Sequence, residues 1–182
     1  NNQVGYAVGS PYNSVLSLAN PTYQRYVLKT LDGGYTWTRS RLLINGLPDY
    51  SLESGTTNFL AIQVFSDDFV IIAGEGGFSY YTINGGFSWQ KVLYNFTTNF
   101  NINSIYMNLS GSRTIFGLDS GEFIDTSAFT NPNSVQTISN ANRYLSGLID
   151  VLSVHGYNNV AYMVGVDGIQ GYTLGTGGVI NP

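Results

Sequence analysis

Two octets in the chain each combine an acidic or amide side chain, two Thr or Ser hydroxyl groups and a glycine pair. Octet 1 spans residues 30–37 (TLDGGYTW), and octet 2 spans residues 82–89 (TINGGFSW). An acid beside hydroxyls on a glycine-rich loop could act in acid–base catalysis. Octet 2, however, carries Asn84 where octet 1 carries Asp32, so it keeps the acceptor oxygen and loses the charge. A structural turn tolerates that exchange and a catalytic acid does not. The two octets together therefore predict a structural motif that occurs twice in the chain.

Each octet fits a tight turn between two antiparallel strands. The Asp or Asn side chain can accept hydrogen bonds from backbone N–H groups that the turn leaves unpaired. The glycines allow positive φ angles, the first hydroxyl can join the same network, and the closing tryptophan is expected to bury its ring against the sheet. We assign this structural role to ten residues: Thr30, Asp32, Gly34, Thr36, Trp37, Thr82, Asn84, Gly86, Ser88 and Trp89.

The elements around the octets read as short β-strands. Runs of four to eight apolar or alternating residues, rich in Tyr, Phe, Val, Ile and Thr, are separated by Gly, Asn, Asp and Ser, and helical periodicity is nearly absent. Expected first strands are residues 60–65, 105–109 and 148–154, and expected second strands are 69–74, 114–117 and 161–165. The fold class predicted from these runs is all-β.

The runs recur in a fixed order, and four threonines set the register: Thr30, Thr82, Thr126 and Thr173. Four strands per repeat of about 40–50 residues indicate a β-propeller blade. We therefore expect one propeller domain or segment with blade 1 at residues 1–45, blade 2 at 58–98, blade 3 at 101–140 and blade 4 at 144–182. Blade 1 lacks its first strand and carries an insertion at residues 10–24, so we expect either part of a larger ring or two ends that complete one another.

The octets resemble the Asp-box, also called the bacterial neuraminidase repeat, which reads S/T-x-D-x-G-x-T/S-W. The longer phrase GYAVG followed by VLKTLDGGYTW resembles the Ycf48-like photosystem II assembly factors. The resemblance implies a propeller with its octets at the outer rim of the blades, and a role in binding a partner protein during assembly. The partner-binding surface of that family depends on basic patches, whereas the seven Lys and Arg residues here are dispersed.

Composition narrows the possible functions. Only 10% of the residues are charged and the net charge is −4, which argues against nucleic acid as the main partner because backbone binding needs clustered cations. The absence of cysteine excludes disulfides and thiolate chemistry, and no apolar run is long enough to span a membrane. Low charge and many Asn, Ser, Thr and Tyr residues favour an extracellular, surface or virion location.

Other candidate sites are weaker than the octets. A sialidase-like glycosidase would need an arginine triad, and the dispersed arginines do not supply its motif. Acidic groups at Asp67–Asp68 and at Asp119, Glu122 and Asp125 lack calcium-loop spacing, and His155 is the only histidine. The GEGGF run at residues 74–78 reads as a strand connection. We therefore expect no catalytic residue, cofactor or metal, and the sequons at Asn95 and Asn108 do not establish glycosylation.

The function predicted from the sequence is a non-catalytic interaction or structural propeller. We place first a scaffold or display protein of a virus particle or cell surface, second an assembly factor of the Ycf48-like type, and third a sialidase-like fragment. The expected partners are proteins, including copies of the chain itself, with neither nucleic acid nor membrane insertion. The expected partner-binding loop is the insertion, with Tyr12, Tyr23 and Arg25 as its contact residues.

Overall fold

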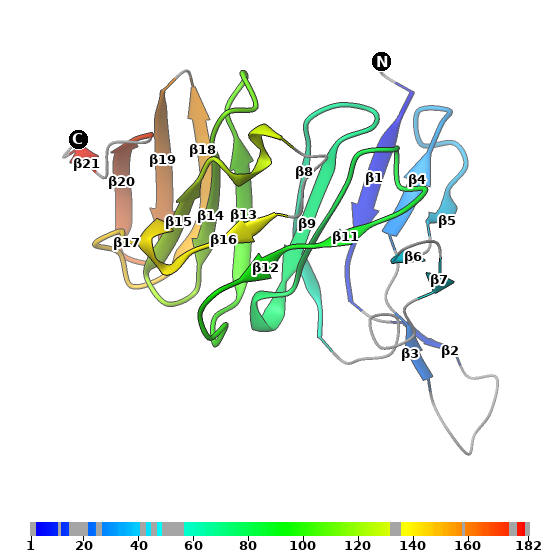
Figure 1. The fold of residues 1–182 in the computed structure, drawn as a ribbon, viewed down its shortest axis with the longest axis horizontal. Coiled ribbons are helices and arrows are strands. Elements are labelled where there is room, and N and C mark those ends of the chain that lie inside the picture. The colour runs from blue at the N-terminus through cyan, green and yellow to red at the C-terminus, as the bar shows by residue number, and fades with distance from the viewer. Residues whose placement is uncertain are drawn as a thin grey trace.

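The structure is a computed structural model that describes most of the chain. The described residues are 3–10, 12–14, 22–24, 27–40, 43–44, 47–48, 57–131, 136–157, 159–174 and 178–180. Four antiparallel sheets stand side by side along the long axis of the molecule (Figure 1). Within the described residues, no helix is long and apolar enough to cross a membrane.

The four sheets follow one another in chain order. Sheet 1 contains β1 (Gly5–Val8), β4 (Val27–Thr30) and β5 (Thr38–Ser40). Sheet 2 contains β8 (Phe59–Val64), β9 (Val70–Gly74), β10 (Ser79–Thr82) and β11 (Gln90–Lys91). Sheet 3 contains β13 (Ile102–Met107), β14 (Thr114–Leu118), β15 (Glu122–Thr126) and β17 (Arg143–Leu145). Sheet 4 contains β18 (Val151–Tyr157), β19 (Val160–Gly165), β20 (Gly168–Thr173) and β21 (Gly178–Ile180).

Shorter elements lie outside the four sheets. Two small hairpins join β2 (Tyr12–Ser14) to β3 (Thr22–Gln24) and β6 (Leu43–Ile44) to β7 (Leu47–Pro48). A parallel pair joins β12 (Leu93–Tyr94) to β16 (Thr137–Ile138), and so ties the segment after sheet 2 to a segment of sheet 3. Three 3₁₀ turns complete the described elements: η1 (Glu75–Gly77), η2 (Ala128–Thr130) and η3 (Asn140–Asn142).

The hydrophobic core lies in the layers between neighbouring sheets. Val27 of sheet 1 packs with Phe59, Ile72 and Trp89 of sheet 2, and comparable clusters fill the spaces between sheets 2 and 3 and between sheets 3 and 4. Sheets 2 and 3 are therefore covered on both faces, which explains why all five residues of β9 are buried. A strand buried on both faces reads as a continuous apolar run and not as an alternating one, as VIIAG does.

The observed sheets agree with the expectation of an all-β fold built from successive antiparallel sheets. The fourth strand of sheet 3 is β17, so this sheet ends at Leu145 and not near residue 140, and its last strand enters the segment assigned to blade 4. The cause is the chain between β15 and β17, which forms η2, β16 and η3 before it returns to the sheet. Pairing of β16 with β12 uses residues that the sequence pattern assigned to the end of the blade.

Candidate functional site

Octet 1 forms the turn between β4 and β5 of sheet 1, and octet 2 forms the turn between β10 and β11 of sheet 2. In octet 1 the Asp32 carboxylate accepts hydrogen bonds from the Thr36 backbone N–H (2.8 Å) and hydroxyl (2.6 Å), and from the Thr30 hydroxyl (2.7 Å). Gly34 N–H donates to the Thr30 hydroxyl at 2.9 Å, and both octet glycines have positive φ angles. These hydrogen bonds, with those from Thr36 contributing most, lower the pKa of Asp32 to about 2.

Octet 2 repeats the network without the charge. The Asn84 Oδ1 accepts from the Ser88 backbone N–H at 2.9 Å and from the Thr82 hydroxyl at 2.9 Å, and Gly86 N–H donates to the Thr82 hydroxyl. One bond is reversed, because Asn84 Nδ2 donates to the Ser88 hydroxyl at 2.8 Å, whereas Asp32 accepts at this place. An amide and a carboxylate thus stabilise the same turn, so the turn does not require the negative charge of Asp32.

The tryptophans that close the octets differ in burial, which corrects one expectation. Trp89 is fully buried, as expected, whereas 44% of the Trp37 side chain is exposed. Sheet 1 covers the face of sheet 2 on which Trp89 lies, and the equivalent face of sheet 1 has no neighbour among the described sheets. Burial of this tryptophan depends on the next sheet and not on the octet that carries it.

Polar contacts also fasten octet 2 to sheet 1. Lys29 Nζ donates to the Gly85 carbonyl at 2.7 Å, and the Ser40 hydroxyl donates to the Gly86 carbonyl at 2.5 Å. The Tyr6 hydroxyl donates to the Asp67 carbonyl at 2.7 Å, and burial, followed by the nearby acidic residues, raises the pKa of Tyr6 to about 12. Octet 2 therefore connects sheet 2 to sheet 1, in addition to forming a turn within sheet 2.

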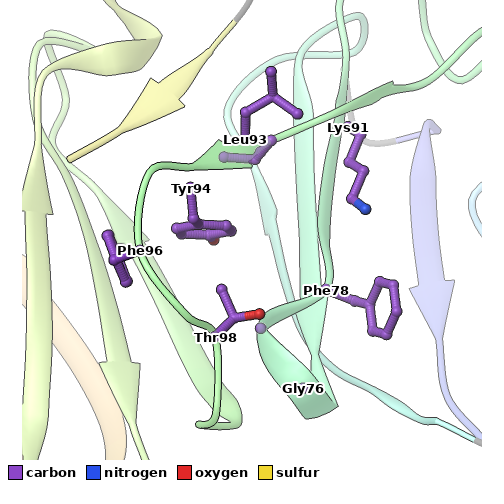
Figure 2. A pocket seen from close by; sticks show the side chains of 9 residues that line it. Gly76, Phe78, Lys91, Leu93, Tyr94, Phe96 and Thr98 are labelled. Carbon is purple, nitrogen blue, oxygen red and sulfur yellow. The ribbon is translucent and has the colours of Figure 1, made fainter. Parts of the chain in front are cut away.

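An open hollow of about 260 Å³ lies between η1 and the segment that follows β11 (Figure 2). Tyr94 and Phe96 project from that segment, while Lys91 and Phe78 lie on the other side of the hollow, and Thr98 lies near Gly76. The remaining lining residues are Gly77, Val92 and Leu93. Aromatic, aliphatic, hydroxyl and ammonium groups thus meet at one opening.

The hollow has a fixed floor and a charged rim. The Tyr94 hydroxyl shares a 2.6 Å hydrogen bond with the Ser79 hydroxyl, and burial raises the pKa of Tyr94 well above its usual range. Phe96 packs edge-on against Tyr94 with ring centroids 5.5 Å apart. Lys91 Nζ lies 5.5 Å from the centroid of the Phe78 ring, a distance at which a cation is attracted to the ring face. The aromatic side chains of Tyr94 and Phe96 are therefore held in place by contacts within the chain.

The acidic residues considered as calcium ligands have separate partners. Asp119 accepts from the Asn101 backbone N–H at 2.8 Å, Glu122 pairs with Arg143, and buried Asp125 pairs with Arg113 at 2.6 Å. Among the described residues, no three His, Cys, Asp or Glu side chains gather in a way that could hold a metal ion. The carboxylates of Asp119, Glu122 and Asp125 thus serve the fold as turn and strand contacts.

The remaining sequence candidates are distributed over the molecule. His155 is an exposed residue of β18, with its ring centroid 6.0 Å from that of Tyr106. The GEGGF run forms η1 and its flanks, where the Glu75 carboxylate accepts from the backbone N–H and the side-chain amide of Asn58. Tyr12 and Tyr23 lie in the antiparallel β2–β3 hairpin, and Arg25 lies outside the described residues.

Comparisons with known proteins show the fold. No family model and no curated protein matches the chain. YCF48 from Cyanidioschyzon merolae matches 88% of this chain and 55% of its own length, with 14% identity and a TM-score of 0.61. The structure of YCF48 bound to D1 peptide matches 99% of this chain and 58% of its own length, with 13% identity and a TM-score of 0.59. Saccharomyces cerevisiae Sqt1 matches 97% of this chain and 48% of its own length, with 11% identity and a TM-score of 0.57. The WD40 β-propeller domain of Doa1 matches 68% of this chain and 39% of its own length, with 13% identity and a TM-score of 0.53.

The chain has a β-propeller fold. It spans roughly half the length of these propeller structures, and its four sheets are four blades of such a fold. Sequence reasoning reached the propeller but missed the hollow beside Tyr94. The signal for the hollow was the aromatic spacing in the chain after β11, where Tyr94, Phe96 and Phe100 are close together in a connection between two blades.

Proposed function

We propose that this propeller is a non-catalytic scaffold that binds a partner protein, and that the hollow beside Tyr94 receives an apolar side chain of that partner. The observation that carries the proposal is the aromatic-lined opening next to Lys91. Its volume of about 260 Å³ lies below the ~300–1,000 Å³ of typical pockets for drug-sized ligands. A single anchoring side chain suits this volume better than a cofactor or a sugar substrate does.

The lining also indicates the chemistry of the partner segment. Aromatic residues are favoured at the centres of protein interfaces, because they bury a large area at a small entropic cost. Lys91 is exposed at the rim and adds one positive charge. We infer that the partner presents an apolar side chain with an acidic group close to it in an extended segment. The solved YCF48 bound to D1 peptide offers a precedent for peptide binding on a similar fold.

Peptide selection tests this function directly. The immobilised chain is challenged with a random peptide library, and enriched peptides are titrated against Lys91→Glu and Leu93→Asp variants. Both substitutions are expected to weaken binding at least about tenfold, the effect of losing ~1.4 kcal/mol of affinity. Arg39→Glu is the matched charge control, since Arg39 pairs with Leu28 as Lys91 pairs with Tyr80, and exposed Leu145→Asp is the apolar control. Equal loss in the controls, or no loss in the two test variants, would refute the proposal.

A second candidate is a structural or display role on a virus particle or cell surface, in which copies of the chain associate. Exposed apolar side chains on the outer face of sheet 4 favour it: Tyr162, Val164 and Ile169. The outer face of sheet 1 adds the half-exposed Trp37. Light scattering of the purified chain separates the two candidates, since association through these faces makes the apparent mass rise with concentration and Val164→Asp suppresses the rise. A mass that stays that of one chain at all concentrations would remove this candidate.

We also propose that octets 1 and 2 are Asp-boxes with a structural role and no part in the binding chemistry. The support is the shared hydrogen-bond pattern around Asp32 and Asn84. Substitution of Asp32 by Asn is expected to leave peptide binding unchanged. An assembly-factor role of the Ycf48-like type stays within the same proposal, with the partner's extended segment bound at the hollow.

A further inference from the structure

Asn84 is followed by a glycine, and its side chain can therefore react with its own backbone. The chain contains two Asn-Gly dipeptides, at residues 45–46 and 84–85, and the first lies outside the described residues. In such a dipeptide the backbone nitrogen of the glycine can attack the side-chain carbonyl carbon of the asparagine, because glycine carries no side chain that obstructs the approach. Asparagine is accordingly one of the thermolabile residues of proteins. The dipeptide in octet 2 is thus a candidate modification site.

Asn84 is an exposed residue, and its amide group is polarised by its neighbours. The Oδ1 atom accepts hydrogen bonds from the Ser88 backbone N–H and from the Thr82 hydroxyl, both at 2.9 Å. Donors at this oxygen stabilise the negative charge that develops on it when a nucleophile attacks Cγ. The Nδ2 atom donates to the Ser88 hydroxyl at 2.8 Å, so a hydroxyl group lies beside the atom that leaves as ammonia. Octet 2 thus contacts both ends of the amide that reacts.

The attacking nitrogen, in contrast, is restrained by the fold. Gly85 is buried, and its N–H donates to the Asp68 carbonyl at 3.0 Å. This nitrogen becomes a nucleophile only when it loses its proton, and both burial and the hydrogen bond oppose that loss. Formation of a five-membered ring also fixes the backbone of Asn84 in a new conformation, so ring closure displaces Gly85. The hydrogen bond to Asp68 must therefore break before the reaction proceeds.

Sheet 1 holds the same part of octet 2 in place. Lys29 Nζ donates to the Gly85 carbonyl at 2.7 Å, and it lies 2.8 Å from the position that a Cβ at Gly85 would take. The Ser40 hydroxyl donates to the Gly86 carbonyl. Because these contacts come from a neighbouring sheet, local separation of sheet 1 removes them while sheet 2 stays folded. The reactivity of Asn84 is therefore linked to the docking of sheet 1.

We propose that Asn84 is a site of intramolecular deamidation, and that the docking of sheet 1 against octet 2 controls its rate. The Gly85 nitrogen loses its proton to hydroxide and forms a bond to Asn84 Cγ. The bond from Cγ to Nδ2 then breaks, and ammonia leaves after taking a proton from water. Water opens the resulting succinimide on one side to give aspartate, or on the other side to give isoaspartate. The reaction needs only water and hydroxide, and it is independent of the hollow beside Tyr94.

The two products have different consequences for the contact between sheets 1 and 2. Aspartate at position 84 fits the turn, because Asp32 occupies the equivalent position of octet 1 with the same backbone hydrogen bond. Only the Ser88 hydroxyl has to turn so that it donates. Isoaspartate adds one methylene group to the main chain, and it shifts Gly85 and Gly86 away from their donors on sheet 1. Deamidation to isoaspartate therefore loosens the docking of the two sheets irreversibly.

Mass spectrometry of the incubated chain tests the proposal. The intact chain and a blocked peptide of residues 82–89 are kept at mildly alkaline pH, and the conversion of Asn84 to aspartate and isoaspartate is followed by peptide mapping. We expect conversion in the folded chain to be at least about tenfold slower than in the peptide, since it proceeds only from the locally opened state. Equal rates would show that docking does not protect the site. A peptide that does not convert would show that the dipeptide is unreactive, and either result would overturn the proposal.

Variants separate local docking from overall stability. Lys29→Met and Ser40→Ala each remove a hydrogen bond from sheet 1 to octet 2, and each should speed the conversion of Asn84 at least about threefold in a chain that circular dichroism shows to be folded. Tyr172→Phe is the matched control, because it removes a hydrogen bond between sheets 3 and 4 and leaves octet 2 untouched. Unchanged rates in Lys29→Met and Ser40→Ala, or an equal rise in Tyr172→Phe, would contradict control by sheet 1.

Discussion

The indole N–H of Trp89 donates a hydrogen bond to the hydroxyl of Ser40 across 3.3 Å, and this bond joins octet 2 to the neighbouring sheet. Ser40 in turn donates to the Gly86 carbonyl, so one hydroxyl links both the glycine pair and the closing tryptophan of the octet to sheet 1. The indole of Trp37 instead donates to Gly34 of its own turn at 3.0 Å. We therefore expect octet 2 to contribute more than octet 1 to the free energy of unfolding, because only octet 2 faces a second sheet among the described residues.

The two tryptophans provide a matched pair for measuring that difference. Trp89→Ala removes a fully buried ring between sheets 1 and 2 and should reduce the free energy of unfolding by about 3–5 kcal/mol. Trp37→Ala removes a ring that is 44% exposed and should cost less than half as much. Urea denaturation followed by circular dichroism measures both. Equal costs would mean that the octet, and not the neighbouring sheet, determines the contribution of its tryptophan.

Ser40 and Trp89 should be energetically coupled. Ser40→Ala removes the acceptor of the indole N–H and the donor to Gly86, and Trp89→Phe removes the indole N–H alone. Residues in direct contact have interaction energies of about 0.5–3 kcal/mol in double-mutant cycles. We expect a coupling in the lower part of that range, since the bond is long. Denaturation of the four proteins of the cycle gives the value, and strict additivity would show that the bond does not contribute to docking of the sheets.

Asp32 should make octet 1 sensitive to acid. Its pKa is lowered from 3.8 to about 2 in the folded chain, so the carboxylate stabilises the turn above pH 3.8, and this contribution is lost as the pH falls towards 2. The amide signal of Thr36, which donates to Asp32, should shift with a midpoint near pH 2. Asp32→Asn should retain the fold at pH 7 and remove this titration. A midpoint near pH 4 would show that the hydrogen bonds to the carboxylate are not formed in solution.

Asp125 should be the carboxylate most important to stability. It is fully buried on β15, pairs with Arg113 at 2.6 Å and accepts from the Tyr172 hydroxyl of sheet 4 at 3.0 Å. Asp125→Ala would leave the arginine without its partner and should cost about 3–5 kcal/mol. Tyr172→Phe should cost about 1–2 kcal/mol, since it removes one hydrogen bond between the sheets. Thermal and urea denaturation check both values, and a neutral Asp125→Ala would mean that the pair is solvated.

The strands and the turns between them could be predicted from the sequence, because they depend on local residue patterns. Alternating and apolar runs bounded by glycines predicted the strands, and the threonines at 30, 82, 126 and 173 end β4, β10, β15 and β20. Contacts between sheets were not predictable in the same way. The exposure of Trp37 depends on a neighbour that octet 1 does not encode, and β16 pairs with a segment more than 40 residues earlier in the chain. The hollow beside Tyr94 arises from that same connection, so its lining residues are recognisable as a group only in three dimensions.

The central claim is that the hollow beside Tyr94 is where this propeller binds its partner, and a nuclear magnetic resonance footprint tests it most directly. A peptide selected from the random library is titrated into the labelled chain. We expect the largest shift changes at residues 76–78 and 91–98, with little change in octet 1 or on sheet 4. Changes centred on another surface, or a selection that enriches no peptide, would contradict the claim.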